Sequence, residues 1–207
     1  MNMKWIVVLI LYINKIKNRT KKIYYVFYNK SFLVYKGAKL GKEVHFNGRM
    51  RIDLFGNAKL VVGDNFISNS GLGHHILANE FSSIEIHNNA IIKIGNNSGI
   101  SCTSICCKKL IEIGDYVNIG AGCFITDTNF HSSNWRMRSD RKDDIDRCPE
   151  SIIIEDYVFI GARSIILKGV HIGARSMVSA GSVVVKDIPA DELWGGNPAK
   201  FIKEIKF

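Results

Sequence analysis

The stretch IIIEDYVFIGARSIILKGVHIGARSMVSAGSVVV, residues 152–185, carries an aliphatic side chain at every sixth position. The unbroken series is Ile154, Ile160, Ile166, Ile172, Val178 and Val184. An α-helix repeats its apolar positions about every 3.6 residues and a half-buried strand about every two, so a period of six fits neither element. A short repeat of this kind is typical of a parallel β-helix, in which each unit supplies one strand and one corner.

The same period occurs upstream of this stretch. Ile113, Ile119 and Ile125 form a second series, and Ile94 and Ile100 form a third. The residue that follows the aliphatic is usually small, as it is at Gly95, Ser101, Gly114, Gly120, Gly161, Gly173 and Ser179. We expect each aliphatic side chain to point into a triangular coil of about 18 residues. The small residue should lie where a larger side chain would clash.

The repeat predicts an all-β fold with a β-helix over residues 40–188. A polar and charged segment over residues 126–151 interrupts the repeat, and we expect it to protrude as a loop, because long structureless stretches inside a repeat are usually functional. Residues 1–39 form a basic and apolar N-terminal segment, and residues 189–207 form a C-terminal tail. We expect a short helical segment at each end.

The positive charge is confined to the N-terminal quarter of the chain. Residues 1–51 hold twelve Lys and Arg and a single acid, Glu43, whereas residues 52–207 hold sixteen basic and eighteen acidic residues. A body near neutrality is not typical of a nucleic-acid-binding protein, but a basic arm can meet an anionic surface.

The N-terminus contains a nine-residue apolar run from Trp5 to Ile13, which is followed by five Lys and Arg residues. Spanning a membrane takes about 20 apolar residues, so the run is too short. It also lacks the small-residue cleavage site of a signal peptide. Two interpretations stay open: the segment packs on the body, or residues 1–22 lie on an anionic membrane. We therefore expect a cytoplasmic protein, at the inner face of the cell membrane under the second interpretation.

Three motifs lie in order along the chain: IGDYVNIGAGCFITDTNFH at residues 113–131, the repeat through Ala190, and GGNPAKFIK at residues 195–203. They resemble the hexapeptide-repeat O-acetyltransferases of the maltose, galactoside and polysaccharide type. The resemblance covers about residues 90–203, and SAGSVVVKDIP and GNPAK are its most specific parts. It implies a left-handed β-helix, acetyl-CoA as co-substrate, and a homotrimer with active sites between neighbouring chains.

The resemblance also implies roles for single residues. His131 falls where the family has its catalytic histidine, and we expect Ser101 and Trp135 on the acceptor side. Coenzyme A would be bound by Phe159, Gly161, Ala162, Ala180, Lys186, Lys200 and Lys203. Within that group, Phe159 takes a position that often holds tryptophan, Gly161, Ala162 and Ala180 line the pantetheine arm, and the lysines meet the phosphates.

The implied reaction needs a base, because an alcohol is a weak nucleophile at neutral pH. Histidine suits this role, with an ordinary pKa of about 6.5. We expect direct attack of the acceptor on bound acetyl-CoA rather than an acetyl-enzyme on Cys123. The five cysteines form no CxxC pair and are expected to be buried hydrophobic residues. Asp127 orients the imidazole or shapes the loop, and we favour the second role.

The predicted function is transfer of an acetyl group from acetyl-CoA to a sugar hydroxyl, in a cell-surface polysaccharide or its precursor, with no metal required. A γ-type carbonic anhydrase would need three zinc-binding histidines, and His131 has no evident partner within the loop. Two alternatives stay open: a non-catalytic β-helix assembly module, and an acetyltransferase that acts on a xenobiotic small molecule.

Overall fold

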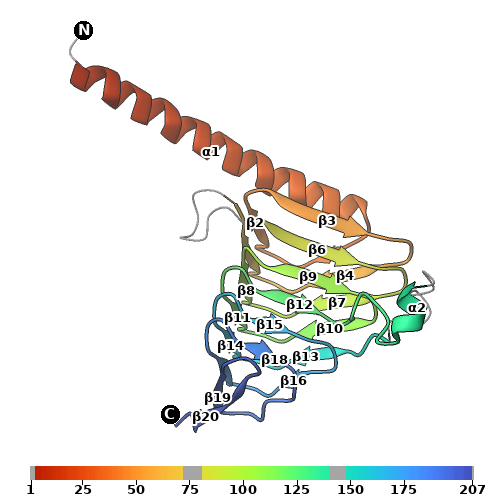
Figure 1. Cartoon of the computed structure of the whole chain (residues 1–207). Coiled ribbons are helices and arrows are strands. Elements are labelled where there is room, and N and C mark those ends of the chain that lie inside the picture. The colour runs from red at the N-terminus through yellow and green to blue at the C-terminus, as the bar shows by residue number, and fades with distance from the viewer. Residues whose placement is uncertain (1–2, 72–80, 140–147, 207) are drawn as a thin grey trace.

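Short parallel strands alternate with corners through most of the chain and wind around one axis (Figure 1). The computed structural model describes residues 3–71, 81–139 and 148–206. Successive strands fall on three sheets in turn, which we call faces A, B and C. The corners between them are called the A–B, B–C and C–A edges.

All strand pairs within faces A and C are parallel. Face A contains β1 (Lys39–Leu40), β4 (Lys59–Val62), β7 (Ile91–Ile94), β10 (Leu110–Ile113), β13 (Ile152–Ile154) and β16 (His171–Ile172). Face C contains β3 (Met50–Leu54), β6 (Ser82–Ile86), β9 (Ser104–Cys107), β12 (Phe124–Thr126), β15 (Ile165–Ile166) and β18 (Val183–Val184).

Face B is the longest sheet and ends in the one antiparallel pair among the described strands. It contains β2 (His45–Asn47), β5 (Ile67–Asn69), β8 (Gly99–Ser101), β11 (Asn118–Ile119), β14 (Phe159–Ile160), β17 (Met177–Val178), β19 (Glu192–Gly195) and β20 (Lys200–Glu204). The parallel β-helix that the repeat predicts is therefore confirmed, and the arrangement is consistent with the left-handed form.

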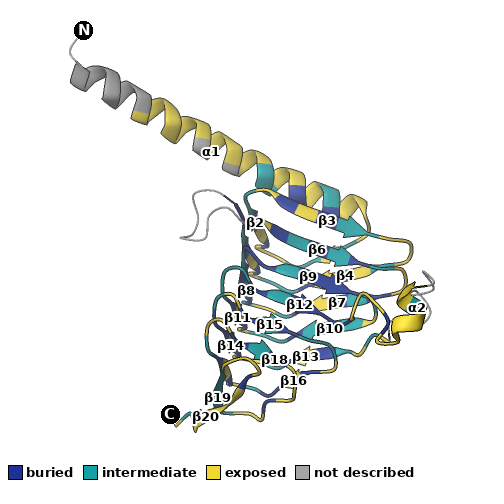
Figure 2. Cartoon of the chain, in the orientation of Figure 1, coloured by how far each residue is buried: buried dark blue, intermediate teal, exposed yellow. Residues whose placement is uncertain are grey.

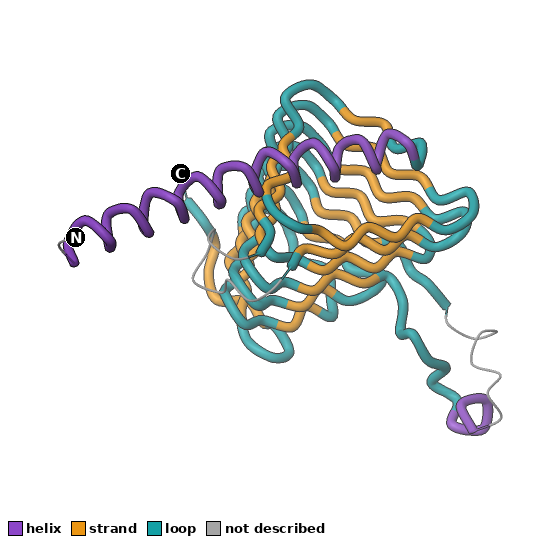
Figure 3. Tube along the Cα trace, turned by 90° about the horizontal axis from the view of Figure 1, so that it is seen from above, coloured by secondary structure: helices purple, strands orange, loops and turns teal. Residues whose placement is uncertain are grey.

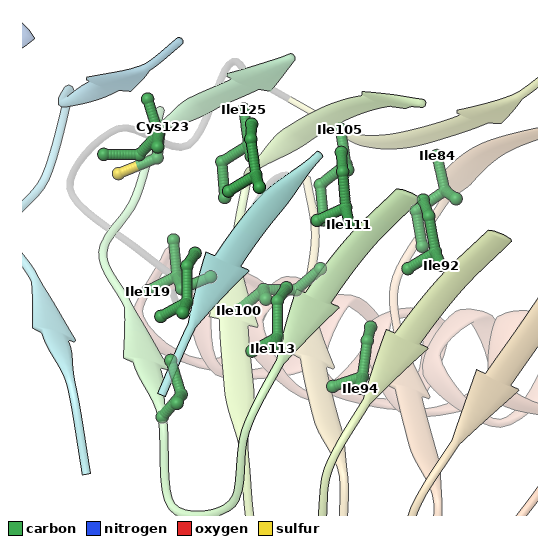
Figure 4. Close-up of a cluster of buried hydrophobic side chains, with 14 of the residues drawn as sticks. Ile84, Ile92, Ile94, Ile100, Ile105, Ile111, Ile113, Ile119, Cys123 and Ile125 are labelled. Carbon is green, nitrogen blue, oxygen red and sulfur yellow. The ribbon is translucent and has the colours of Figure 1, made fainter. Parts of the chain in front are cut away.

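The hexad aliphatics fill the interior of the coil. On face A, Ile94, Ile113, Ile154 and Ile172 align in register, and each is no more than 3% exposed. Isoleucines of all three faces converge on the axis (Figure 4). Branched side chains stacked on their own equivalents fill such a core without voids.

The A–B edge is held by a row of short polar side chains. Carboxylates or amides of Asp64, Asn96, Asp115 and Asp156 each accept a hydrogen bond from a backbone N–H one coil earlier, at 2.6 to 2.9 Å. The residue after several of these has a left-handed backbone, with φ of 55° at Asn97. Asparagine tolerates this conformation better than most residues, which explains its place at a corner.

The N-terminal segment forms one long helix, α1 (Met3–Tyr35), of 33 residues, rather than a short one. It crosses the first coil and continues beyond the body (Figures 1 and 3). Its contact with the body lies near its C-terminal end, where Leu33 is fully buried and the amide of Asn29 donates to the carbonyl of Gly48 at 2.8 Å. In the described part of the chain, no helix is both long and apolar enough to cross a membrane.

The expected C-terminal helix is wrong. Residues 192–204 form β19 and β20 instead. Leu193 and Trp194 continue the parallel ladder of face B, and β20 folds back on them in antiparallel register. Phe201, Ile202 and Ile205 have a spacing that suits a helix, but pairing with the open edge of β19 satisfies the backbone of both segments.

The close approach of backbone between coils explains why the hexad has a small residue after the aliphatic one. A Cβ atom at Gly173 would lie 2.4 Å from the backbone nitrogen of Ala190, and Gly161 has the same separation from the nitrogen of Ala180. We predict that Gly173→Ala lowers the free energy of unfolding by about 1–3 kcal/mol, as overpacking does. Urea denaturation measures this change.

Gly99→Ala is the matched control, because the nearest heavy atoms to a Cβ there lie at 3.4 and 3.7 Å, which are ordinary contacts. It should leave stability within about 0.5 kcal/mol of the parent. Equal losses in the two variants would show that backbone approach does not set the choice of glycine.

Candidate functional site

The inserted loop leaves the body at the C–A edge, and Asp127 anchors its root. The side chain of Asp127 is fully buried immediately after β12. Its carboxylate accepts backbone N–H groups from Lys108 and Lys109, both at 2.7 Å, and from Leu110 at 3.0 Å. Those residues form the same edge one coil earlier. This geometry supports a structural role for Asp127.

The returning end of the loop is tied to the same edge. The backbone N–H of Glu150 donates to the carbonyl of Asp127 at 3.0 Å. The ammonium of Lys168 donates to the carboxylate of Glu150 at 2.6 Å, and this hydrogen bond holds the pKa of Glu150 below its ordinary value. The two ends of the loop are therefore fixed beside each other.

His131 is exposed on the first part of the loop. Its backbone N–H donates to the carbonyl of Asn129 at 2.7 Å. The preceding Phe130 has a φ of 61°, and its ring stacks on Phe124 of face C with centroids 6.2 Å apart. The stacking holds the loop backbone at Phe130 against face C. The exposed imidazole of His131 therefore belongs to the residue directly after this contact.

Trp135 begins α2 (Trp135–Ser139), which lies away from the coil (Figure 3). The indole is 64% exposed, and the guanidinium of Arg136 lies 5.3 Å from its ring centroid. The amide oxygen of Asn134 accepts the backbone N–H of Arg136 at 3.0 Å and caps the short helix. Trp135 thus presents an open aromatic surface on the protruding loop.

A hollow of about 430 Å³ opens on the outer side of face B. Gly99 lies in the ladder between Ile67 and Asn118, so the missing side chain leaves a notch between their side chains. Ser101 lines the hollow and is half-buried. The structure therefore places the predicted acceptor residue Ser101 in a concave site on the outer side of the coil.

Four amides line the same hollow: Asn65, Asn69, Asn97 and Asn118. None of the described residues that line it is ionisable. Carboxamides offer both donors and acceptors, as neutral polyols require. No local sequence pattern marks these residues as a site. Only the strand register, which places Asn69 beside Ser101, shows that they meet.

Phe159 lies at the boundary of this hollow and is 44% exposed. It stands in the face B ladder between Asn118 and Met177. On its other side is a second hollow of about 330 Å³, which is also lined by Tyr157, Arg175 and Ile205. Phe159 thus offers an open ring between two concave surfaces.

The B–C edge brings together the residues predicted for the pantetheine arm. Gly161 and Ala162 follow β14, and Ala180 follows β17 in the next coil. Gly161 is buried, whereas Ala162 is half-buried and Ala180 is exposed. Because the side chains are minimal, Ala162 and Ala180 leave this edge open to an extended ligand, whereas the N–H and the carbonyl of Gly161 are already bonded within the coil.

The three predicted phosphate-binding lysines are divided between two places. Lys200 begins β20 opposite Gly195, near the B–C edge, and Lys203 pairs with Leu193 farther along face B. Lys186 follows β18 on the C–A edge. All three lysines are exposed.

One chain therefore carries two separate groups of predicted residues. Face B and its B–C edge hold Ser101, Phe159, Gly161, Ala162, Ala180, Lys200 and Lys203. The C–A edge holds His131, Trp135 and Lys186. Face C lies between the two edges, so the single chain does not bring His131 together with the hollow.

The thiols are poorly placed for covalent catalysis. Four of the five cysteines are buried and Cys148 is exposed. The Cys123 thiol donates to the carbonyl of Gly161 at 3.2 Å inside the coil. Burial, with help from the charge of Glu85, raises the pKa of Cys106 to about 11, and burial also raises the pKa of Cys107. Because the thiolate is the nucleophile, these positions favour the core role that the sequence predicts.

One group of side chains in the described ranges could hold a metal ion: Glu85, His87 and Cys106, with ligand atoms within 4.8 Å of one another. The Nε2 of His87 lies 2.8 Å from the carboxylate of Glu85. An ordinary hydrogen bond therefore explains why these two side chains lie close together. A carbonic anhydrase site needs three histidines. This group supplies a single histidine.

Residues 151–186 match the family described as the hexapeptide repeat of succinyl-transferase. A hexapeptide-repeat acetyltransferase from Vibrio cholerae is 30% identical, over 75% of this chain and 74% of that chain, with a TM-score of 0.51. A structure of it complexed with acetyl-CoA aligns at 38% identity over 56% of this chain and 61% of that chain, also with a TM-score of 0.51. The chain belongs to the hexapeptide-repeat acetyltransferase family.

A tetrahydropyridine-dicarboxylate N-acetyltransferase from Clostridium perfringens is 58% identical over 53 residues, or 26% of this chain. The match spans 22% of the length of that curated relative. An N-acyltransferase from Bacillus cereus, solved with dTDP and 3-hydroxybutyryl-CoA, is 20% identical over 86% of this chain and 88% of that chain. Its TM-score of 0.63 reflects the shared fold.

The Asp127 contacts predict a loss of stability on substitution. Asp127→Asn keeps the volume but replaces one acceptor oxygen with an amide NH2 donor that faces backbone N–H donors. We expect a loss of about 1–3 kcal/mol in the free energy of unfolding, as for a buried group left unsatisfied. His131→Ala is the control and should unfold like the parent, because His131 is exposed. Unchanged stability of Asp127→Asn in urea denaturation would contradict the anchoring role.

Proposed function

We propose that the protein is an acyltransferase on a left-handed β-helix, which moves the acetyl group of acetyl-CoA to a sugar hydroxyl with His131 as general base. The observation that carries the proposal is the pairing of two features: an exposed histidine on an anchored loop and an uncharged, amide-lined hollow beside an open backbone edge. The donor is a cytoplasmic metabolite, which would place the reaction in the cytoplasm.

The donor would lie along the B–C edge. Gly161 keeps this edge free of side-chain bulk, Ala162 and Ala180 are partly or fully exposed on it, and extended pantetheine carries amides that pair with exposed backbone groups. Lys200 and Lys203 supply exposed cations at the end of the same face for the phosphates. Phe159 would pack beside the thioester, in the position that often holds tryptophan in the family.

The reaction follows from the chemistry of the groups. His131 takes the proton of the acceptor hydroxyl as its oxygen attacks the thioester carbon, and the new C–O bond forms. A backbone N–H or the Ser101 hydroxyl would stabilise the tetrahedral oxyanion. The C–S bond then breaks, and the imidazolium returns its proton to the coenzyme A thiolate. No metal takes part in this scheme.

The scheme needs two chains, because His131 lies at the C–A edge of the coil whereas the hollow lies on face B. We propose a homotrimer in which the loop of one chain reaches face B of its neighbour. The fixed root at Asp127 would set the direction of that reach, and Trp135 would cover the acceptor.

The acceptor is proposed to be a neutral sugar unit of a polysaccharide or its precursor. Amide side chains around Gly99 can each bind a pair of hydroxyls, and no ionisable group lines the described hollow to favour a charged acceptor. The relative from Clostridium perfringens is an N-acetyltransferase. Transfer to an amine of a small molecule is therefore the second candidate.

The first test is a thiol-release assay with acetyl-CoA and matched acceptors, one panel of sugars and one of amino sugars and small amines. We expect turnover with sugars and a loss of about a hundredfold or more in His131→Ala, the size of a general-base contribution. His171→Ala is the control, because this exposed histidine contacts Glu155 on face A, away from the hollow.

The outcomes separate the candidates. Turnover with amines alone would replace the sugar acceptor but keep the donor and the base. Full activity of His131→Ala would remove the histidine from the mechanism. Absence of coenzyme A binding would favour a non-catalytic assembly module.

A mixing experiment tests whether two chains build the site. Ala180→Trp should block the B–C edge, and His131→Ala removes the base, so each variant alone is inactive. If trimers are co-assembled from equal amounts, random assortment gives intact pairs at about a quarter of the sites. We expect activity near that fraction of wild type. No recovery in assembled mixed trimers would place the site within one chain.

A further inference from the structure

The helix α1 leaves most of its length uncovered. It projects beyond the body (Figure 1), and its surface is largely exposed (Figure 2). Apolar side chains are strongly exposed along it, with Ile23 at 63%, Phe27 at 75% and Tyr35 at 84%. Few soluble proteins leave a continuous apolar surface open to water, so such a surface marks an interaction site.

Four of the exposed apolar residues form one stripe. At 100° per residue, Ile16, Ile23, Phe27 and Val34 fall within an arc of about 40°. Leu33, which packs against the body, lies on a different side of the helix. The stripe is therefore exposed, while the side of α1 that lies about 100° from it is attached to the first coil.

Basic residues surround the stripe unevenly. At 100° per residue, Arg19 and Lys30 lie about 60° and 40° from its centre on one side, and Lys17 and Lys21 lie about 100° and 140° from it on the other. Residues 1–36 contain eight Lys and Arg and no acid, the first acid being Glu43. An apolar stripe on an otherwise basic helix is the pattern of a helix that lies in the headgroup region of an anionic bilayer.

A groove continues the stripe onto the body. It has a volume of about 1090 Å³ and is formed by one side of α1 and the outer side of face B. Ile23, Phe27 and Val34 line it from the helix, and Ile67 lines it from β5. Arg19 and Lys30 also line it, so an apolar cleft is bordered by cations. Acyl chains and phosphate headgroups complement these two features.

We propose that α1 docks this protein on a bilayer of anionic phospholipids, with the stripe and the groove in contact with the lipid. A second copy of the chain is the competing occupant. Pairing two such helices along the stripe would bring Arg19 and Lys30 against the cations of the second helix, with no acid in the helix to compensate. An anionic surface instead gains from the same charges. This inference is independent of the proposed acetyl transfer.

The test is co-sedimentation of the full chain with vesicles of phosphatidylcholine and phosphatidylglycerol at about 3:1, and with pure phosphatidylcholine. We expect binding to the anionic vesicles that is at least about tenfold stronger than to neutral ones and that falls at high salt. The triple variant Ile16→Gln, Ile23→Gln and Phe27→Gln should lose binding at least tenfold. Glutamine retains helix propensity, so the helix itself should persist in circular dichroism.

Two controls on the body match these changes. Val61→Asp replaces an exposed apolar residue on face A that lies between Lys39 and Lys93 in the ladder, and it should bind like the parent. Lys59→Glu reverses an exposed charge on face A, whereas Arg19→Glu with Lys30→Glu reverses two on α1 that line the groove. The helix pair should lose most of the binding and Lys59→Glu little of it.

The particle mass of the parent and the triple variant in lipid-free solution completes the test. Equal masses are expected. Absence of binding by the parent, or equal binding by the triple variant, would overturn the proposal. A lower mass of the triple variant, with its vesicle binding retained, would also overturn it and assign the stripe to a second copy.

Discussion

The spacing of backbone between successive coils is the constraint on which the whole molecule depends. Parallel strands in a sheet lie about 4.8 Å apart, so a coil that closes on three faces brings every corner equally close to the next. At the corners that hold Gly161 and Gly173, no room remains for a Cβ atom. The hexad satisfies that spacing with a small residue after many of the inward aliphatic residues, and the faces, the edges and the hollow around Gly99 follow from this repeat.

The same constraint explains how a loop can be inserted without disturbing the body. The chain leaves face C after Thr126 and rejoins face A at Ile152, in register with Ile111 one coil earlier. The carboxylate of Asp127 receives the backbone N–H groups of that earlier corner, and Glu150 returns the chain to it. The coil therefore closes with the same register as it would have without the loop. The loop residues beyond its root do not have to pack in the core.

The sequence predicts the fold well where a residue repeats its environment, and less well where the environment occurs once. Ile154, Ile160 and the later members of the series recur every six residues in the same environment, so their period alone predicts that they lie in the core. Lys200 to Glu204 form a strand because the edge of β19 is open beside them. The local sequence of residues 200–204 does not indicate that this edge is available for pairing. The amides around Gly99 are far apart in sequence, and only the register gathers them. His131 could be chosen through resemblance, but its separation from the hollow follows from which edge carries the loop.

A solenoid is in principle an open polymer, since each coil presents an unpaired strand to the next. In this chain the last parallel strand of face B, β19, is paired with the antiparallel β20. The residues of β20 are all exposed and include Lys200 and Lys203. At the opposite end α1 lies across the first coil and buries Leu33. Charged or covered ends prevent strands of separate molecules from joining. The chain's two non-repetitive segments thus limit its length to one molecule and suppress end-to-end fibre growth.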